Sequence, residues 1–169
     1  MGEKLDKKVT IEKRFVMGYI EDNLMSGEEI TYRSHLHWVV FLWPIIWFVI
    51  GILFFIAGGD TAVVGVIFIL IAMIHSTSSF ITYKTSEFGI TNKRILAKVG
   101  FIRRNSLEVL LTKVEGIQVN QGILGRILGY GSIVVSGTGG SKDPFHKISA
   151  PLEFRKRAQE QVAAVQESR

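Results

Sequence analysis

The sequence predicts a membrane protein of mixed α and β structure, in which a two-helix transmembrane hairpin precedes a small antiparallel β domain. Two segments, 38–57 and 62–81, contain no charged residue and are each 20 residues long, which is enough to cross the hydrocarbon core of a bilayer. Between residues 82 and 150 the apolar residues recur with a period of two, as in strands. The final segment, 151–168, has the apolar spacing of an amphipathic helix that caps the domain.

The two apolar segments are separated by GGDT at residues 58–61. A single helix across the whole region would be about twice as long as a bilayer is thick. The alternative is a buried helical hairpin in a soluble protein, but the remaining polar sequence is too short to enclose two such helices. A signal peptide is not expected, because the apolar run begins near residue 38 and is too long for the apolar region of a signal peptide. We therefore expect a cytoplasmic N-terminal segment at 1–37 and a β domain at 82–169. Between them we expect two spans at 38–57 and 62–81, joined by an external loop at 58–61.

Basic residues flank the hairpin on one side only. The connecting loop has no Lys or Arg, whereas Arg33 precedes the first span and Lys84 follows the second. The positive-inside rule therefore places both termini in the cytoplasm, with the hairpin in the cytoplasmic membrane. Trp38, Trp43 and Tyr83 lie where aromatic side chains anchor spans at the interface. The chain contains no cysteine, which excludes disulfides and thiol catalysis.

The predicted β domain is strongly basic. Residues 82–169 carry a net charge of +7, more than the +5 of the whole chain. A tethered domain of this charge faces an anionic leaflet, so the phospholipid membrane, and not nucleic acid, is the expected partner. The alternative is a solvated basic face that only satisfies the positive-inside rule. The candidate lipid-facing patch comprises Lys84, Lys93, Arg94, Lys98, Arg103 and Arg104.

Small residues form a stripe along the second span, which lets it pack closely on the first span or on another subunit. Pro44 leaves the carbonyl of Val40 without its helical donor, and we expect His75, Ser76 or Thr77 to donate to it across the hairpin. An ionisable residue within the membrane can also mark a functional site, so both interpretations of the histidine stay open. The candidate packing and polar residues of the spans are Pro44, Gly65, Ala72, His75, Ser76 and Ser79, with Ala62 in the same stripe.

Outside the spans, the pattern predicts short elements. Residues 1–14 are charged and weakly patterned, as in a mobile tail, while 15–27 predicts a short helix and 28–38 alternates as a strand does. Six or seven short β-rich runs separated by turn sequences follow the hairpin. They predict a small, partly open barrel or sandwich whose C-terminal helix closes one end. This architecture is close to that of a pleckstrin-homology (PH) domain.

The segment GILGRILGYGSIVVSGTGG (122–140) holds seven of the chain's 17 glycines. Glycine-rich loops can bind phosphate, but this spacing matches neither a Walker A loop nor a dinucleotide fingerprint, because Gly131 opens a strand. We interpret the glycines as boundaries and close-packing points of a short helical turn whose apolar face plugs the barrel. Arg126 would pair with an acid such as Glu115 or with a ligand. The fold-signature residues are Gly122, Gly125, Arg126, Gly129 and Gly131.

Candidate catalytic groups are few. His35 and His37 form an H-x-H pair that could supply two zinc ligands from one side of a strand, but a third ligand is not evident, and anchoring at the interface is the alternative. His146 fits a surface strand, and Asp143 fits the turn formed with the proline that follows it. We therefore expect a protein without enzyme activity, cofactor or bound metal.

Several strings resemble bacterial PH-like membrane proteins of the YdbS type. They are FGITNKRIL (88–96) and KVEGIQVNQGILGRILGYGSIVVSGTGG (113–140), preceded by two apolar spans and by GEEITYRSHLHW (27–38). The resemblance covers roughly residues 19–160 and implies one PH-like domain, no catalytic residues, and a homo-oligomer as one option, since some bacterial PH-like domains form rings. Eukaryotic PH domains bind inositol phosphates through basic residues of their first strand–loop–strand, which the resemblance places at residues 84–94.

Two functions from different classes follow. In the first, the β domain is a binding or scaffolding module fixed to the membrane, which recruits a protein or peptide, or assembles with itself, through exposed strand edges. In the second, the domain binds or senses anionic lipid through its basic face. A transport or channel component is a weaker alternative, because two helices per chain form no path unless several copies assemble.

Overall fold

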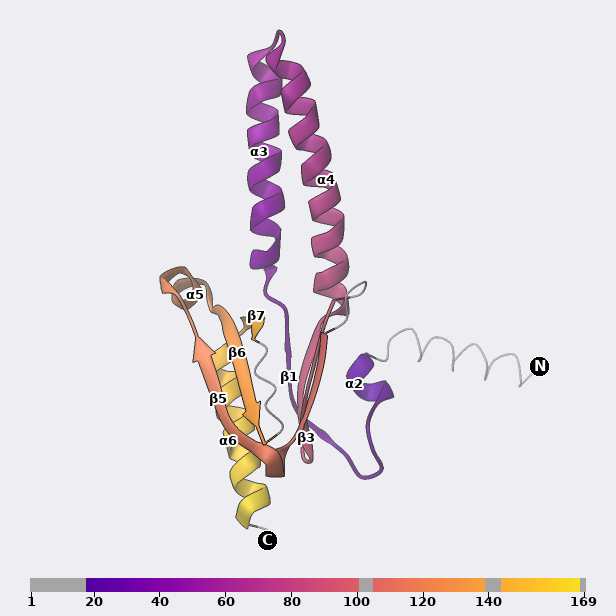
Figure 1. Cartoon of the computed structure of the whole chain (residues 1–169), viewed down its shortest axis with the longest axis vertical. Helices are drawn as coiled ribbons and strands as arrows, with labels where there is room; N and C mark the ends of the chain where they lie inside the picture. The colour runs from indigo at the N-terminus through magenta and orange to yellow at the C-terminus, as the bar shows by residue number, and fades with distance from the viewer. Residues whose placement is uncertain (1–17, 101–104, 139–143, 168–169) are drawn as a thin grey trace, which may run out of the picture.

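The computed structural model describes residues 18–100, 105–138 and 144–167, and two long helices project from one end of a β domain (Figure 1). The helices are α2 (Tyr19–Asp22), α3 (Leu42–Ala57), α4 (Thr61–Thr85), α5 (Ile123–Leu128) and α6 (Pro151–Glu167), with the 3₁₀ turns η1 (Trp38–Phe41) and η2 (Leu111–Lys113). The strands are β1 (Ile30–His35), β2 (Glu87–Thr91), β3 (Arg94–Val99), β4 (Asn105–Leu110), β5 (Val114–Asn120), β6 (Tyr130–Gly137) and β7 (Phe145–Ser149).

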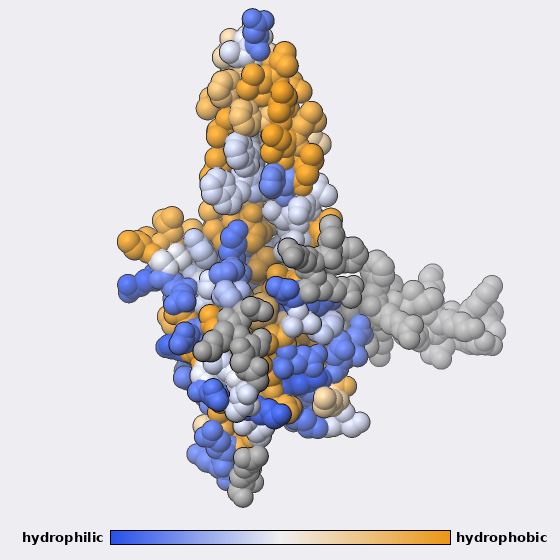
Figure 2. Space-filling view, in the orientation of Figure 1, coloured by the Kyte–Doolittle hydropathy of each residue, from blue (hydrophilic) through white to orange (hydrophobic). Residues whose placement is uncertain are grey.

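The helices α3 and α4 form the predicted hairpin, and both apolar segments are long enough to cross a membrane. Figure 2 shows the apolar surface that surrounds them. The second helix continues to Thr85, four residues beyond the expected end at 81, because residues 82–85 include no glycine or proline that would end it. Its end is marked by side chains that bond back to the last turn: Thr85 Oγ1 donates to the Ile81 carbonyl (2.8 Å) and Ser86 Oγ to the Thr82 carbonyl (2.6 Å).

Small residues hold the two long helices together. A Cβ atom on Gly65 would lie 2.5 Å from the Phe55 backbone nitrogen, and one on Gly51 would lie 2.7 Å from the Ile69 side chain. Both distances are too short for any residue with a side chain at these positions. Gly65 and Ala72, two members of the predicted small-residue stripe, are the buried residues of α4, and Gly65 packs closely on α3, whereas Ser76 of the same stripe is exposed.

The described strands form two antiparallel sheets, one of four strands in the order β1-β2-β3-β4 and one of three in the order β5-β6-β7. Seven antiparallel strands followed by a C-terminal helix confirm the predicted β architecture. The sheets are joined at β1, where Leu36 bridges Ile148 and the Ser34 hydroxyl donates to the Ser149 carbonyl at 2.8 Å. They therefore behave as one sandwich and not as two separate units.

The hairpin is inserted between the first two strands of the sandwich. The strand β1 precedes it, β2 follows it, and the two strands pair in antiparallel fashion with His35 opposite Glu87. The expected strand within 28–38 is thus present, and it belongs to the sheet that continues after the hairpin. A division of the chain at residue 82 would separate these two partners, because sheet pairing joins residues that sequence order places 52 positions apart.

The core lies between the two sheets and α6. Phe88 and Ile95 come from the four-stranded sheet, Ile133 from the three-stranded sheet, and Phe154 and Ala158 from α6, and all five are buried. Burial alternates along β6, as expected for a strand with one face on the core. The helix α6 contributes the apolar stripe predicted for it and runs along the sandwich away from the hairpin (Figure 1).

A single helical turn, α2, covers the other face of the four-stranded sheet. Ile20 of this turn is buried against Gly89 of β2, where a Cβ atom would lie 2.6 Å from the Ile20 side chain. The backbone N–H groups of Tyr19 and Ile20 donate to the Glu87 carboxylate at 3.1 and 3.2 Å. A carboxylate at a helix N-terminus satisfies donors that have no partner within the helix.

Candidate functional site

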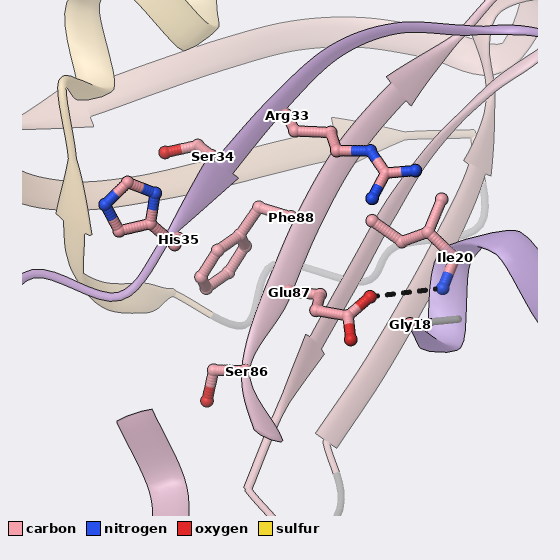
Figure 3. Close-up of a pocket in the computed structure, with 8 residues that line it drawn as sticks. All are labelled: Gly18, Ile20, Arg33, Ser34, His35, Ser86, Glu87 and Phe88. Atoms are coloured by element: carbon pink, nitrogen blue, oxygen red, sulfur yellow. Dashed lines mark hydrogen bonds between the residues drawn. The ribbon is translucent and has the colours of Figure 1, made fainter. Parts of the chain in front are cut away.

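A pocket of about 290 Å³ lies between α2 and the β1–β2 pair, close to the base of the hairpin (Figure 3). Its lining includes the charged groups of Arg33 and Glu87 and the hydroxyls of Ser34 and Ser86. Each of these groups has a structural partner. Arg33 forms an ion pair with Glu21, the Glu87 carboxylate accepts from α2, and both hydroxyls donate to backbone carbonyls. The described side chains of this pocket therefore form no nucleophile–base pair.

The most buried polar cluster lies at the β2–β3 turn and centres on Arg94. Its guanidinium donates to Glu28 through Nε at 2.9 Å and Nη2 at 3.0 Å, and to Glu108 through Nη1 at 2.6 Å. The Thr91 hydroxyl lies 2.7 Å from the Glu28 carboxylate. Arg94, Glu28 and Thr91 are all buried, so charges removed from water here are compensated by direct pairing.

Hydrogen bonding outweighs burial at Glu28. Burial alone would raise the pKa of this carboxyl, but bonds from the Arg94 guanidinium, the Met25 backbone and the Thr91 hydroxyl lower its pKa to about 2. The same pairing with Glu28 raises the pKa of Arg94 above its usual value. Both groups are therefore charged at neutral pH and serve to join the segment before β1 to the β2–β3 turn.

The candidate basic patch does not form one exposed face. Arg94 is buried in the cluster just described, which corrects its place in that patch. Lys84 is exposed at the end of α4, and Lys98 lies with Nζ 4.4 Å from the centre of the Tyr19 ring. Lys93 is at the opposite end of the sheet, where Nζ donates to the Ser26 carbonyl at 2.6 Å. Two further members of the patch, Arg103 and Arg104, lie outside the described residues.

The first strand–loop–strand of the sandwich is also not the 84–94 segment that the resemblance suggests. Since β1 is Ile30–His35 and β2 is Glu87–Thr91, the connection between them is the hairpin itself. Basic side chains between these strands are confined to Lys84 near its end. The connection between β1 and β2 is therefore not a basic loop that could form a headgroup pocket.

Within the hairpin, the hydroxyl that reaches the Val40 carbonyl belongs to Ser79, at 3.3 Å. The expectation of His75, Ser76 or Thr77 is therefore wrong by two to four residues. Thr77 Oγ1 instead bonds back to the Met73 carbonyl at 3.0 Å. His75 is exposed on the outer surface of α4. Three further candidates, Pro44, Ala72 and Ser76, line a shallow groove of about 270 Å³ together with Ile45, Phe48 and Met73.

The first part of the glycine-rich segment, residues 122–129, forms the tip of the β5–β6 hairpin. Gly122 is the N-cap of α5, and Gly129 is its C-cap in the left-handed region at φ 81°. A Cβ atom on Gly125 would lie 2.6 Å from the Tyr130 carbonyl oxygen, and one on Gly131 would lie 2.6 Å from the Gln121 side chain. These contacts agree with the interpretation of the glycines as boundaries and close-packing points.

The apolar face of α5 does not plug the sandwich, which corrects the second half of that interpretation. Ile123, Leu124 and Ile127 are 81%, 65% and 74% exposed. Among the described residues, Arg126 forms no ion pair with Glu115, which lies near the other end of β5. The apolar spacing predicted a face correctly, but spacing alone does not say what covers that face.

The two histidines before α3 have different environments. His35 is exposed, whereas His37 is buried as the N-cap of η1, where its Nδ1 accepts from the Val39 backbone at 3.2 Å. Burial lowers the pKa of His37, and a hydrogen bond to the Leu128 backbone partly opposes this. The ring of His37 also packs on the Tyr130 ring, with centroids 5.4 Å apart. His37 thus joins the start of the hairpin to the end of α5.

The free edge of the four-stranded sheet is a further candidate site. Sheet order leaves β4 with one described neighbour, β3. Beside it lies a groove of about 230 Å³. The groove is lined by Leu107, Glu108, Val109, Leu110, Lys113, Gly137 and Thr138. Leu110 is 42% exposed here, so an apolar side chain and an unpaired strand edge are available at one place.

The structure brings together several residues that sequence patterns did not single out. Glu28, Thr91 and Glu108 complete the Arg94 cluster. A charged residue inside an otherwise apolar strand pattern is the one available signal, because such a charge needs a partner. The identity of that partner depends on the pairing of distant segments and is not encoded in local spacing.

Comparison with known proteins places the chain in one family. Residues 39–168 match the family model described as "Bacterial PH domain". This match covers about three quarters of the chain and begins after β1, at the start of the hairpin. No curated protein and no solved structure matches the chain.

Proposed function

The chain belongs to the bacterial PH domain family, and from that premise we propose that it is a membrane-anchored scaffold which binds a protein segment along β4. In this proposal the hairpin spans the cytoplasmic membrane, and both termini lie in the cytoplasm. The single observation that carries it is the insertion of the hairpin between β1 and β2, which fixes one edge of the sheet to the membrane and leaves β4 at the opposite edge.

Exposure of the hairpin supports the anchor. Within the chain, only 22% of the apolar stretch of the first helix is buried, and only 11% of the apolar stretch of the second helix. A core helix of a soluble protein would be mostly buried, because exposing such an apolar surface to water is strongly unfavourable. The distribution of Lys and Arg on one side of the hairpin supports the cytoplasmic location of the β domain.

Backbone geometry supports β4 as the binding edge. The Leu111 N–H donates to the Lys93 carbonyl at 2.9 Å, which sets the alternation of hydrogen-bonded pairs along β3 and β4. Ser106, Glu108 and Leu110 then direct their backbone groups away from β3. An extended peptide could pair with these groups as an added strand, while the adjacent groove accepts an apolar side chain.

A proline at Ser106 tests this edge. Ser106→Pro removes one outward N–H without removing a bond to β3, and edge strands tolerate proline at such positions. We expect Ser106→Pro to lose the proteins that co-purify with the intact chain in native lipid nanodiscs, and the control Ser106→Ala to keep them. Retention of the same partners by both variants would exclude β4. If the partner recovered is a second copy of the chain, sizing of the two variants will show an oligomer only for Ser106→Ala.

A further inference from the structure

The short helix α5 presents an apolar surface with no partner in the described chain. Ile123, Leu124, Ile127 and Leu128 are 81%, 65%, 74% and 37% exposed. In a chain whose other exposed aliphatic residues lie mainly on the hairpin, four adjacent ones at the tip of a β-hairpin are a distinct feature. Solvent exposure of four such side chains is unfavourable and indicates that something covers them.

Local packing prevents α5 from turning this surface inward. Gly125 faces Tyr130 so closely that a Cβ atom would lie 2.6 Å from its carbonyl oxygen. The Gln121 side-chain amide donates to the same carbonyl at 3.0 Å, and Gly129 ends the helix in the left-handed region. The helix is thus held on the strand β6 by its glycine face, and its aliphatic face is held outward.

The helix α5 lies beside the base of the hairpin formed by α3 and α4. His37 contacts both the Tyr130 ring and the Leu128 backbone, and the next residue, Trp38, is the first of the apolar segment. Figure 1 shows α5 at the end of the β domain from which the long helices project. In Figure 2 an apolar patch protrudes there, beside the base of the hairpin and at the border between its apolar surface and the polar domain.

The charge of residues 121–131 also agrees with a position at the border between the apolar hairpin and the polar domain. Residues 121–131 contain one charged side chain, the exposed Arg126, and no acid. Arg126 lines a shallow hollow together with Ile123 and Ile127. Aliphatic side chains beside a single cation are typical of segments that lie at the interface of an anionic leaflet, where the arginine stays at headgroup level.

We propose that α5 inserts its aliphatic face into the cytoplasmic leaflet of the bilayer that the hairpin spans. This inference rests on the proposed membrane anchor and adds a third point of membrane contact. The hairpin holds the four-stranded sheet through β1 and β2, and a third contact at the tip of β5–β6 would also hold the three-stranded sheet at the membrane. The free edge of β4 is thereby held at a constant angle to the membrane surface.

The natural absence of cysteine allows a direct test with single-cysteine variants of the full chain in nanodiscs of phosphatidylethanolamine and phosphatidylglycerol. Each variant carries a small fluorophore, and quenching is measured with nitroxide lipids of two depths and with aqueous iodide. Ile127→Cys reports on α5. Val49→Cys, roughly 16 Å along the helix from Trp38, is the deep control, and Gln166→Cys, near the end of α6, is the aqueous control.

For Ile127→Cys we expect shallow nitroxides to quench at least about twofold more than deep ones, since interfacial helices reach about 5–10 Å into the bilayer. Val49→Cys should show the reverse order. If Ile127→Cys is as open to iodide as Gln166→Cys while Val49→Cys is lipid-quenched, the inference is overturned and the anchor stands. If Val49→Cys is not lipid-quenched, the anchor itself is overturned.

Shielding of position 127 from iodide without lipid quenching would mean that protein covers α5, which also overturns the inference. Ile123→Cys gives a second reading on the same face and replaces Ile127→Cys if that variant does not fold. If lipid nitroxides quench Ile127→Cys but shallow ones do not quench Ile123→Cys more than deep ones, the result would likewise count against insertion of the helix face.

Discussion

Removal of the Glu28 charge should destabilise the β domain by about 3 kcal/mol at neutral pH. The pKa of Glu28 is lowered from 4.5 to about 2, and lowering a pKa by 1 corresponds to about 1.4 kcal/mol of stabilisation of the charged form. In Glu28→Gln, one carboxylate oxygen becomes an amide donor, so one of the two bonds from the Arg94 guanidinium is lost and the other loses its charged acceptor. For a urea slope of about 2 kcal/mol/M, the unfolding midpoint should fall by about 1–2 M.

The pH dependence of this loss has a defined sign. Because the pKa of Glu28 is lower in the folded state than in the unfolded state, its stabilising contribution is complete above about pH 4.5 and is lost as the pH falls toward 2. The difference in stability between the natural chain and Glu28→Gln should therefore be constant from pH 7 to 5. Below pH 4.5 it should shrink.

The assay follows loss of the β-sheet circular dichroism signal in urea, with the chain held in detergent so that the hairpin stays helical. The matched control is Glu21→Gln, because the ion pair of Glu21 with Arg33 is more exposed, and such pairs contribute less than about 1 kcal/mol. Equal midpoints for Glu28→Gln and the natural chain at pH 7 would refute the assigned role of the cluster. A difference that persists unchanged at pH 3 would refute the ionic explanation.

Two glycine substitutions test the close contacts of α5 with β6 and of α4 with α3. Gly125→Ala places a Cβ atom 2.6 Å from the Tyr130 carbonyl oxygen, and we expect a loss of about 1–3 kcal/mol from overpacking, whereas Gly122→Ala, which meets open space, should cost less than about 1 kcal/mol. Gly65→Ala forces α4 away from the Phe55 backbone, and the hairpin should lose thermal stability in detergent, as followed by helical circular dichroism; an unchanged transition would contradict the tight interface.

Local sequence patterns predicted those helices and strands whose formation is decided by residues within the element itself. The two long helices follow from uninterrupted apolar sequence, and the strands follow from alternation that the burial of β6 reproduces. The glycines of α5 were predictable as caps, because Gly129 occupies a backbone region that other residues avoid. In each case the cause lies within a few residues of its effect.

Features that depend on distant pairing were not predictable in the same way. The β1–β2 pair brings together residues on either side of the hairpin, and the burial of Arg94 depends on Glu28, which is 66 positions away. Sequence spacing could show that Arg94 is basic but not that a buried carboxylate neutralises it. For the same reason the aliphatic face of α5 was assigned to the barrel interior, although its glycine face is the one that packs.

The connections between hairpin and sheet indicate that the domain is a rigid extension of its anchor. Only Leu36 and His37 separate β1 from η1, and only Ser86 separates α4 from β2. His37 caps η1 through its ring, and the Ser86 hydroxyl accepts from the Gly100 backbone at 3.3 Å while donating into the last turn of α4. Because β1 and β2 are themselves paired, the two helix ends cannot separate without breaking the sheet, so a displacement of α3 relative to α4 would be transmitted directly to the strands that lead to β4.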